Sequence, residues 1–217
     1  AKLEYGDRTF RYAKLDSSND DAGKLLQTRV AEANHRDRSV SSAVSAGAST
    51  ITVNLGTPAA AENEYSEGYL HINAVAGNGQ LFRIKSHPAH PADTTADVVF
   101  TLYDKVKTAL TGSSKADLIH SSYHNLIVAP AAETGAVSGV TVIDMTASNY
   151  GWIQTSGPCS ILHDASVASI VLGETVVRSN AVAGAVRPAP SDVLHSVGQT
   201  LVVNANTLHS VIHLKLE

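Results

Sequence analysis

The chain contains little cysteine and few charged residues. Its 217 residues include one cysteine, Cys159, which excludes an internal disulfide framework and a cysteine-based zinc cluster. Charged residues make up 17% of the chain, below the usual quarter or so, whereas hydrophobic residues make up 43%. This balance excludes disorder over most of the length and allows a sizeable core.

Long apolar runs and an excess of positive charge are also missing. No apolar run reaches the roughly 20 residues that a membrane-spanning helix needs. The formal net charge of -4 argues against a dedicated nucleic-acid-binding protein, which needs an excess of cations. We therefore expect neither a nucleic acid nor a membrane among the partners of this chain.

Motifs of common enzymes do not occur in the sequence. There is no phosphate-binding GxxxxGK[ST] loop, and GxGxxG, HExxH and GxSxG are missing too. Three pairs among the ten histidines have spacings that resemble those of metal ligands: His87 and His90, His120 and His124, and His209 and His213. Four residues of strand span roughly 13 Å, too far for one zinc ion to bind both members of the last pair. His120 and His124 could share an ion only if the chain turned between them. We expect no enzyme activity, no cofactor and no metal site within the chain.

Two residues that occur once each have two interpretations. Cys159 could be a reactive thiol if nearby His163 lowered its pKa, but a small buried core residue is the better interpretation. Trp152 could stack on a sugar ring, but an anchor in the core or at a subunit interface is the more common role of tryptophan.

Alternating hydrophobicity predicts strands through most of the chain. Residues 50–55 alternate polar and apolar side chains without interruption, and residues 68–73 do so again. This period of two, rich in β-branched residues, is typical of strands, and residues 77–79 between two such runs predict a hairpin. We expect an all-β fold, with a β-sandwich or barrel-like body and an extended N-terminal arm.

The same alternation predicts the core. The side chains expected on the apolar faces of these strands are Ile51, Val53, Leu55, Leu70, Ile72, Phe82, Ile84, Val98, Phe100 and Leu102.

The composition of the chain changes near residue 45. Residues 1–38 hold half of the 16 cations together with seven of the 20 acids, whereas the remainder is poor in charge. We predict an N-terminal arm over residues 1–45 and a β-rich body over residues 46–217. Within the arm, residues 20–34 fit a short helix, and residues 23–30 fit a strand equally well.

The arm carries aromatic residues among charges of both signs. It is either an edge hairpin folded onto the body or an extended segment that docks on another protein, and we expect the second. Aromatic rings would then be the anchors and arginines would pair with carboxylates. A mobile arm of this kind could be deleted over residues 1–38 while the body stayed folded. The predicted contact residues for a partner or a second subunit are Tyr5, Arg8, Phe10, Arg11, Tyr12 and Trp152.

Short segments spread along the chain, in a constant order, carry a resemblance to a known family. They are residues 5–15, 52–56, 67–73, 85–89, 127–130, 139–141 and 151–159. The first reads YGDRTFRYAKL and the last reads GWIQTSGPC. In these segments the chain resembles the head decoration, or capsid cement, proteins of tailed bacteriophages.

The resemblance implies a β-rich structural protein of the virion, on the outer capsid surface, without catalytic residues. Such proteins clamp neighbouring major capsid proteins, often as trimers, and so stabilise the shell. The expected partners are therefore the major capsid protein and further copies of this chain in a homotrimer. The alternative function is a phage tail or fibre module that recognises a cell-surface glycan, for which the aromatic content of 5% offers few exposed platforms.

Overall fold

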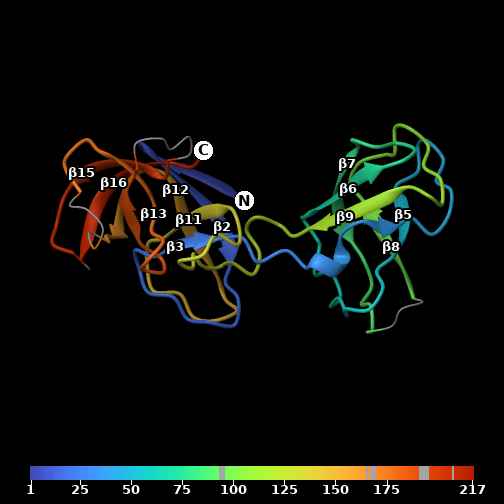
Figure 1. The fold of residues 1–217 in the computed structure, drawn as a ribbon, viewed down its shortest axis with the longest axis horizontal. Helices are drawn as coiled ribbons and strands as arrows, with labels where there is room; N and C mark the ends of the chain where they lie inside the picture. Colours follow the sequence, from blue (N-terminus) through green and yellow to red (C-terminus); the bar gives the residue numbers. More distant parts are fainter. Residues whose placement is uncertain (93–95, 165, 167–169, 191–195, 207) are drawn as a thin grey trace. The chain divides into compact units, whose positions relative to one another are not determined.

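The chain forms two compact units, each built of β-strands (Figure 1). The structure, a computed structural model, describes residues 1–92, 96–164, 166, 170–190, 196–206 and 208–217. Unit 1 comprises Ala1–Val30 and Ser122–Glu217, and unit 2 comprises Ala31–Ser121, so unit 2 is an insertion in the sequence of unit 1. Within the described residues the helical structure is limited to one 3-10 turn, η1 (Ala33–His35). None of the described helical residues form a segment that is long and apolar enough to cross a membrane. The prediction of an all-β, barrel-like fold is confirmed.

Unit 1 is a ten-stranded antiparallel sheet that curls on itself. Its strands are β1 (Lys2–Tyr5), β2 (Arg8–Lys14), β3 (Leu25–Gln27), β10 (Ile127–Val128), β11 (Val137–Thr141), β12 (Tyr150–Leu162), β13 (Thr175–Arg178), β14 (Val186–Pro188), β15 (Gly198–Val202) and β16 (His209–Lys215). The main order is β10-β3-β11-β12-β16-β15-β13-β14, and the β1–β2 hairpin adds to β12. Backbone hydrogen bonds from Gly184 to Ala129 and from Leu25 to Gly184, both 2.8 Å, draw the two edges of the sheet together.

Strand β12 is the central element of unit 1. Its first half pairs with β2 and β11, and its second half pairs with β16. The register of the β2–β12 ladder shifts between Gln154 and Ser156, which marks a β-bulge, and Gly157 follows with φ of 85°. A Cβ atom on Gly157 would lie 2.3 Å from the backbone oxygen of Asp7, so this close approach requires glycine.

Two apolar clusters fill unit 1. One contains the buried residues Leu25, Ala129, Val140, Cys159, Ile161, Ile170, Val176, Val186, Val197, Ile212 and Leu214. The other contains Ala13, Leu15, Leu26, Leu126, Met145 and Ile153. Both clusters therefore include side chains from the first 30 residues of the chain.

The beginning of the chain is part of this sheet, which corrects the predicted division into residues 1–45 and 46–217. The units of the structure change after Val30 and after Ser121, because β2 and β3 are hydrogen-bonded into unit 1. A high density of charge marks a solvated face of β2 and says nothing about where a domain ends. Of the two interpretations of this segment, the structure has the edge hairpin and not the extended arm.

The segment over residues 20–34 is also settled by the structure. It contains strand β3, all three residues of which are buried, followed by the 3-10 turn η1, and it forms no α-helix. Since Leu25 and Leu26 of this strand are fully buried, deletion of residues 1–38 would remove part of the core. The expectation that such a deletion leaves the rest of the chain folded therefore does not agree with the structure.

Unit 2 is a six-stranded antiparallel sheet. Its strands are β4 (Arg38–Ser39), β5 (Thr50–Asn54), β6 (Tyr69–Ala74), β7 (Leu81–Ser86), β8 (Asp97–Leu102) and β9 (Lys115–Ile119), in the order β4-β9-β6-β7-β8-β5. The two edges meet at a bridge between Val40 and Val53, and the Ser41 amide donates to the Thr52 carbonyl at 2.9 Å. The sheet is thus closed into a small barrel.

The predicted core of unit 2 is confirmed. All ten residues expected on the apolar faces are buried, with exposed fractions of at most 4%, and they belong to one cluster. The predicted hairpin around residues 77–79 joins β6 to β7. These strands alternate because one face packs into the barrel and the other meets water, so a pattern of period two locates them.

Candidate functional site

Three aromatic rings lie side by side on the outer face of β2 and β12. The ladder places Tyr12 beside Trp152 and Lys14 beside Tyr150. The ring centroids of Tyr12 and Tyr150 are 5.4 Å apart and nearly parallel, at 9°, and those of Tyr12 and Trp152 are 5.2 Å apart at 58°. Because Ala13 and Ile153 point into the core, their neighbours in the two strands point outward. We call Tyr12, Tyr150 and Trp152 the aromatic row.

The β1–β2 hairpin extends this surface. Its ladder pairs Leu3 with Phe10 and Tyr5 with Arg8, and the loop between the strands is Gly6-Asp7, with a positive φ at Gly6. A positive φ at the first of two loop residues is typical of a type II′ hairpin turn. Leu3 and Tyr5 are exposed, at 45% and 69%. Phe10 lies two residues from Tyr12 on the same strand and therefore on the same face.

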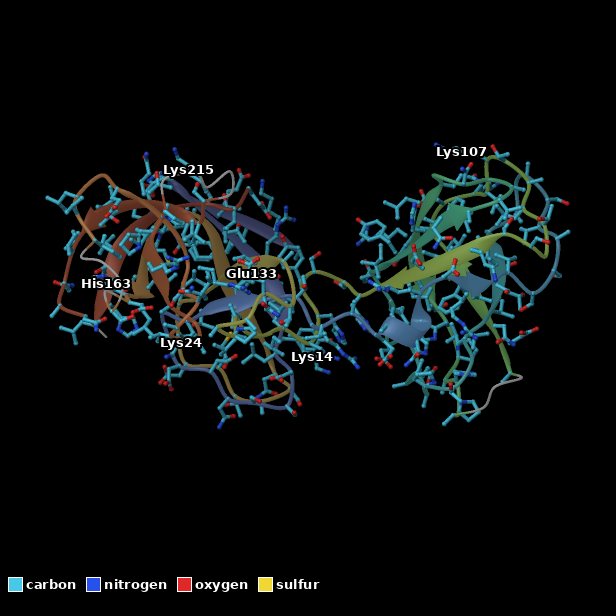
Figure 2. All side chains as sticks on the ribbon, in the orientation of Figure 1. Lys14, Lys24, Lys107, Glu133, His163 and Lys215 are labelled. Atoms are coloured by element: carbon cyan, nitrogen blue, oxygen red, sulfur yellow. The ribbon has the colours of Figure 1, made fainter. Side chains whose placement is uncertain are left out.

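Two cations lie against the rings of this surface. The Arg8 guanidinium carbon is 5.4 Å from the centroid of the Phe10 ring and 6.0 Å from that of Tyr5. Lys14, which Figure 2 labels, has its Nζ 5.7 Å from the centroid of the Tyr150 ring. Cation–π contacts of this kind hold the long side chains over the rings and leave their charge facing solvent. The eight residues together form what we call the aromatic face: Leu3, Tyr5, Arg8, Phe10, Tyr12, Lys14, Tyr150 and Trp152.

Arg11 lies on the other face of β2 and has a partner within the chain. Its Nε donates to Glu217 Oε1 at 2.6 Å, and the hydroxyl of Tyr123 donates to the same oxygen at 2.9 Å. The hydrogen bond from Arg11 holds the pKa of Glu217 below its usual range, and burial raises the pKa of Tyr123 to about 12. Of the six predicted contact residues, the structure gathers five on the aromatic face and separates Arg11 from them.

A pocket of about 360 Å³ adjoins the aromatic face at Arg8. Gln154, Cys159 and His209 are among the residues that line it. Cys159 is 4% exposed and burial raises its pKa to about 12, so the thiol stays protonated at neutral pH. Its interpretation as a buried core residue is confirmed, and the pocket has no thiolate nucleophile to offer.

Unit 2 contains a cluster of buried histidines that sequence reasoning did not group together. The ring of Tyr65, fully buried, stacks on His120 with centroids 4.3 Å apart. The Tyr65 hydroxyl is hydrogen-bonded to His35 Nδ1 at 2.5 Å, and the Tyr65 amide donates to His87 Nε2 at 3.0 Å. Since Nε2 of His87 accepts, its Nδ1 is the protonated nitrogen and donates to the Pro88 carbonyl at 2.8 Å. His87 is therefore neutral, and burial lowers its pKa.

In the structure, the histidine pairs with ligand-like spacing differ in their surroundings. His87 and His90 are both buried, but His90 donates from Nε2 to the Gly56 carbonyl at 2.8 Å. His120 and His124 belong to different units. Among the described residues, no group of three or more histidine, cysteine, aspartate and glutamate side chains could hold a metal ion. His87 and His90 thus serve as hydrogen-bonding residues in the interior of unit 2.

Comparison with known proteins adds no further constraint to these sites. No protein-family model, no curated protein and no solved structure matches the chain.

Proposed function

We propose that this chain is a structural protein of a tailed-phage virion, which decorates the outer surface of the capsid and clamps neighbouring major capsid proteins. The exposed aromatic face on β1, β2 and β12 is the observation that carries the proposal. The resemblance of residues 5–15 and 151–159 to head decoration proteins supports it, because these two segments provide most of that face.

The composition of the aromatic face suits attachment to a protein. Tyrosine, tryptophan and arginine are the side chains that most often dominate binding energy at protein interfaces. Arg8 and Lys14 can pair with carboxylates on the partner while the rings bury apolar surface. A face of this kind binds by shape and charge and needs no cofactor.

Strand β1 offers a second means of attachment. All four of its residues are exposed, and in the described part of the chain it pairs with β2 alone. A partner could therefore add a strand along the free edge of β1, which would place its side chains next to Leu3 and Tyr5. Several copies bound in this way, as a trimer, would hold several capsid subunits at once and gain avidity.

Sedimentation with undecorated capsids tests this function. The full-length protein should pellet with capsids that lack it, in a ratio to the major capsid protein that indicates groups of three. Tyr12→Ala and Trp152→Ala should each weaken this binding about tenfold or more, because each removes an aromatic anchor. Tyr103→Ala is the matched control, since Tyr103 is a 53% exposed tyrosine in unit 2. Full-length protein that stays in the supernatant would contradict the proposal.

The second candidate function, recognition of a cell-surface glycan by a tail or fibre protein, is favoured by the aromatic row alone. Exposed rings in a row could stack on successive sugars. Binding of the protein to immobilised host glycans, lost in Trp152→Ala and accompanied by no binding to capsids, would favour this candidate over capsid decoration.

A further inference from the structure

A second pocket, of about 580 Å³, opens at one end of the barrel of unit 1. Its lining residues lie where β13 and β16 end and where β11, β14 and β15 begin. The apolar part of the lining comes from Val137, Val177, Val197 and Leu216. The volume is typical of small-molecule sites, and the mouths of barrels are common places for them.

Arg178 brings a buried charge into this pocket. Its side chain is 8% exposed, and its Nη1 donates to Gln27 Oε1 at 3.1 Å. Gln27 is itself fully buried and donates from Nε2 to the Thr134 hydroxyl at 2.8 Å, so the orientation of its amide is fixed. This arrangement holds the guanidinium in place from one side.

The other side of the Arg178 guanidinium lacks an acceptor. Nη2 is buried and makes no hydrogen bond within the described part of the chain. Glu133, labelled in Figure 2, places its Oε1 3.4 Å from Nη2, but the Glu133 side chain is 91% exposed. An exposed ion pair of this geometry contributes little, so it does not offset the cost of burying the Nη2 donor.

Arg187 adds a second guanidinium to the same lining. It lies opposite Val177 in the β13–β14 ladder, and its Nε is also buried without a hydrogen bond among the described residues. Among the described residues that line the pocket, two guanidinium groups and one carboxylate give one positive charge in excess. Both arginines, each with one donor that has no hydrogen bond among the described residues, thus line the same pocket as the apolar side chains.

From these contacts we infer that the pocket binds a small monocarboxylate, with its carboxylate on Arg178 and Arg187 and its apolar part against the valine and leucine walls. The planar fork of a guanidinium matches a carboxylate. One excess positive charge balances one negative charge, whereas a phosphate dianion would remain partly uncompensated in an apolar pocket. Glu133 also lines the pocket, and it competes with the incoming carboxylate for Nη2 while its charge remains at the site.

Binding of hexanoate to the full-length protein, measured by calorimetry, is the direct test. Hexanamide is the uncharged control and should bind at least about tenfold more weakly, because it lacks the charge that pairs with arginine. Inorganic phosphate should bind more weakly than hexanoate. Acetyl-Ala-Leu-Val with a free and with an amidated C-terminus distinguishes a free acid from the end of a peptide chain as the source of the carboxylate.

Three variants locate the site. Arg178→Gln and Arg187→Gln should each weaken the binding of hexanoate about tenfold or more, and Glu133→Gln should strengthen it, because the competing carboxylate is removed. Arg83→Gln is the matched control, since Arg83 is paired with Glu67 in unit 2. If Arg178→Gln failed to fold, Arg187→Gln and Glu133→Gln would still decide the matter. The inference is overturned if neither hexanoate nor the free-acid peptide binds, if hexanamide binds as tightly as hexanoate, or if phosphate binds more tightly.

Discussion

Tyr12 and Trp152 are direct partners across the β2–β12 ladder, and the centroids of their rings lie 5.2 Å apart. Each was expected to be a contact residue for a partner, and the fold makes them contacts of one another. The pair joins the start of the chain to its second half on one exposed surface.

The first prediction concerns the energy of this pair. A double-mutant cycle with Tyr12→Ala and Trp152→Ala should give a coupling of about 0.5–1.5 kcal/mol in the free energy of unfolding, as found for aromatic pairs. Chemical denaturation followed by circular dichroism measures it. The same cycle with Tyr12 and Tyr103, which belong to different units, should give no coupling. Equal values in the two cycles would contradict the structure of the aromatic row.

The second prediction concerns the beginning of the chain. Deletion of residues 1–7 removes β1, whose residues are all exposed, and should leave unit 1 folded. Deletion of residues 1–15 also removes Ala13 and Leu15 from the core and should unfold unit 1. Hydrogen exchange at the amides of β16 distinguishes the two results. A folded unit 1 after the longer deletion would mean that β2 is dispensable.

The third prediction concerns the core of unit 2. Phe100 is fully buried and its ring lies 4.9 Å from that of His87. Phe100→Ala should lower the free energy of unfolding of unit 2 by about 3–5 kcal/mol, because a large cavity is left. Val99→Ala is the control on the outer face of the same strand, at 45% exposure, and should cost below about 1 kcal/mol. Similar losses for both variants would place Phe100 on the wrong face.

The fourth prediction concerns acid sensitivity in unit 2. Burial lowers the pKa of His87 from its ordinary value of 6.5, although nearby Glu64 and Glu62 act in the opposite direction. Below pH 6.5 the unfolded chain therefore binds a proton that the folded chain does not. The stability that neutral His87 contributes is complete above this pH and is lost progressively as the pH falls.

Hydrogen exchange at the amides of β8, measured from pH 7.5 to 5, reports this loss as an increase in opening beyond the intrinsic pH effect. His87→Gln keeps an acceptor for the Tyr65 amide and removes the titrating ring, so its pH dependence should be weaker. His213→Gln in unit 1 is the control and should leave unit 2 unchanged. A steep dependence that persists in His87→Gln would assign it to another group.

The fifth prediction concerns Asp20 in unit 1, where stability should fall as the pH rises, opposite to the effect of His87. Burial, with help from Asp16 and Asp21, raises the pKa of Asp20 from 3.8 to about 6, and its buried Oδ2 makes no hydrogen bond to any described residue. Between these pH values the folded chain holds a proton that the unfolded chain releases, so stability falls as the pH rises. Asp20→Asn should therefore stabilise unit 1 by about 1–2 kcal/mol at pH 7 and by less at pH 4. Thermal denaturation at the two pH values checks this, with Asp7→Asn, an exposed aspartate in the loop between β1 and β2, as the control.

The sequence predicted the parts of this molecule that depend on local alternation. The strands of unit 2 have one wet face and one dry face, so Phe82, Val98 and Phe100 could be assigned to the core from the pattern alone. In β2, arginines lie on both faces of the strand, because Arg11 is paired with Glu217. The charged residues therefore hid the pattern that would have predicted a strand in the sheet of unit 1.

The pattern of alternating residues gave no information about which distant segments of the chain pair with one another. The pairing of β2 with β12 depends on the tertiary fold, and it decides both the domain boundaries and the composition of the aromatic face. The carboxylate pocket depends on Arg178 and Arg187, which are separated by a turn and look like ordinary strand residues in the sequence. Among the histidines that pack around Tyr65, His87 and His120 were noticed for their spacing, but His35 and Tyr65 itself were not.

The insertion of unit 2 within unit 1 also bears on how the chain folds. The β2–β12 ladder must close a long loop of chain, and the cost in conformational entropy grows with the length of that loop. Within unit 2, however, Arg38 and Ala116 are neighbours in the β4–β9 ladder, so folding of unit 2 brings together two points near its own ends. A folded unit 2 shortens the loop that unit 1 has to close and lowers the entropic cost by on the order of 1 kcal/mol. The folded unit 2 thus acts as a turn between the two parts of unit 1. The saving in conformational entropy for unit 1 is largest when unit 2 folds first.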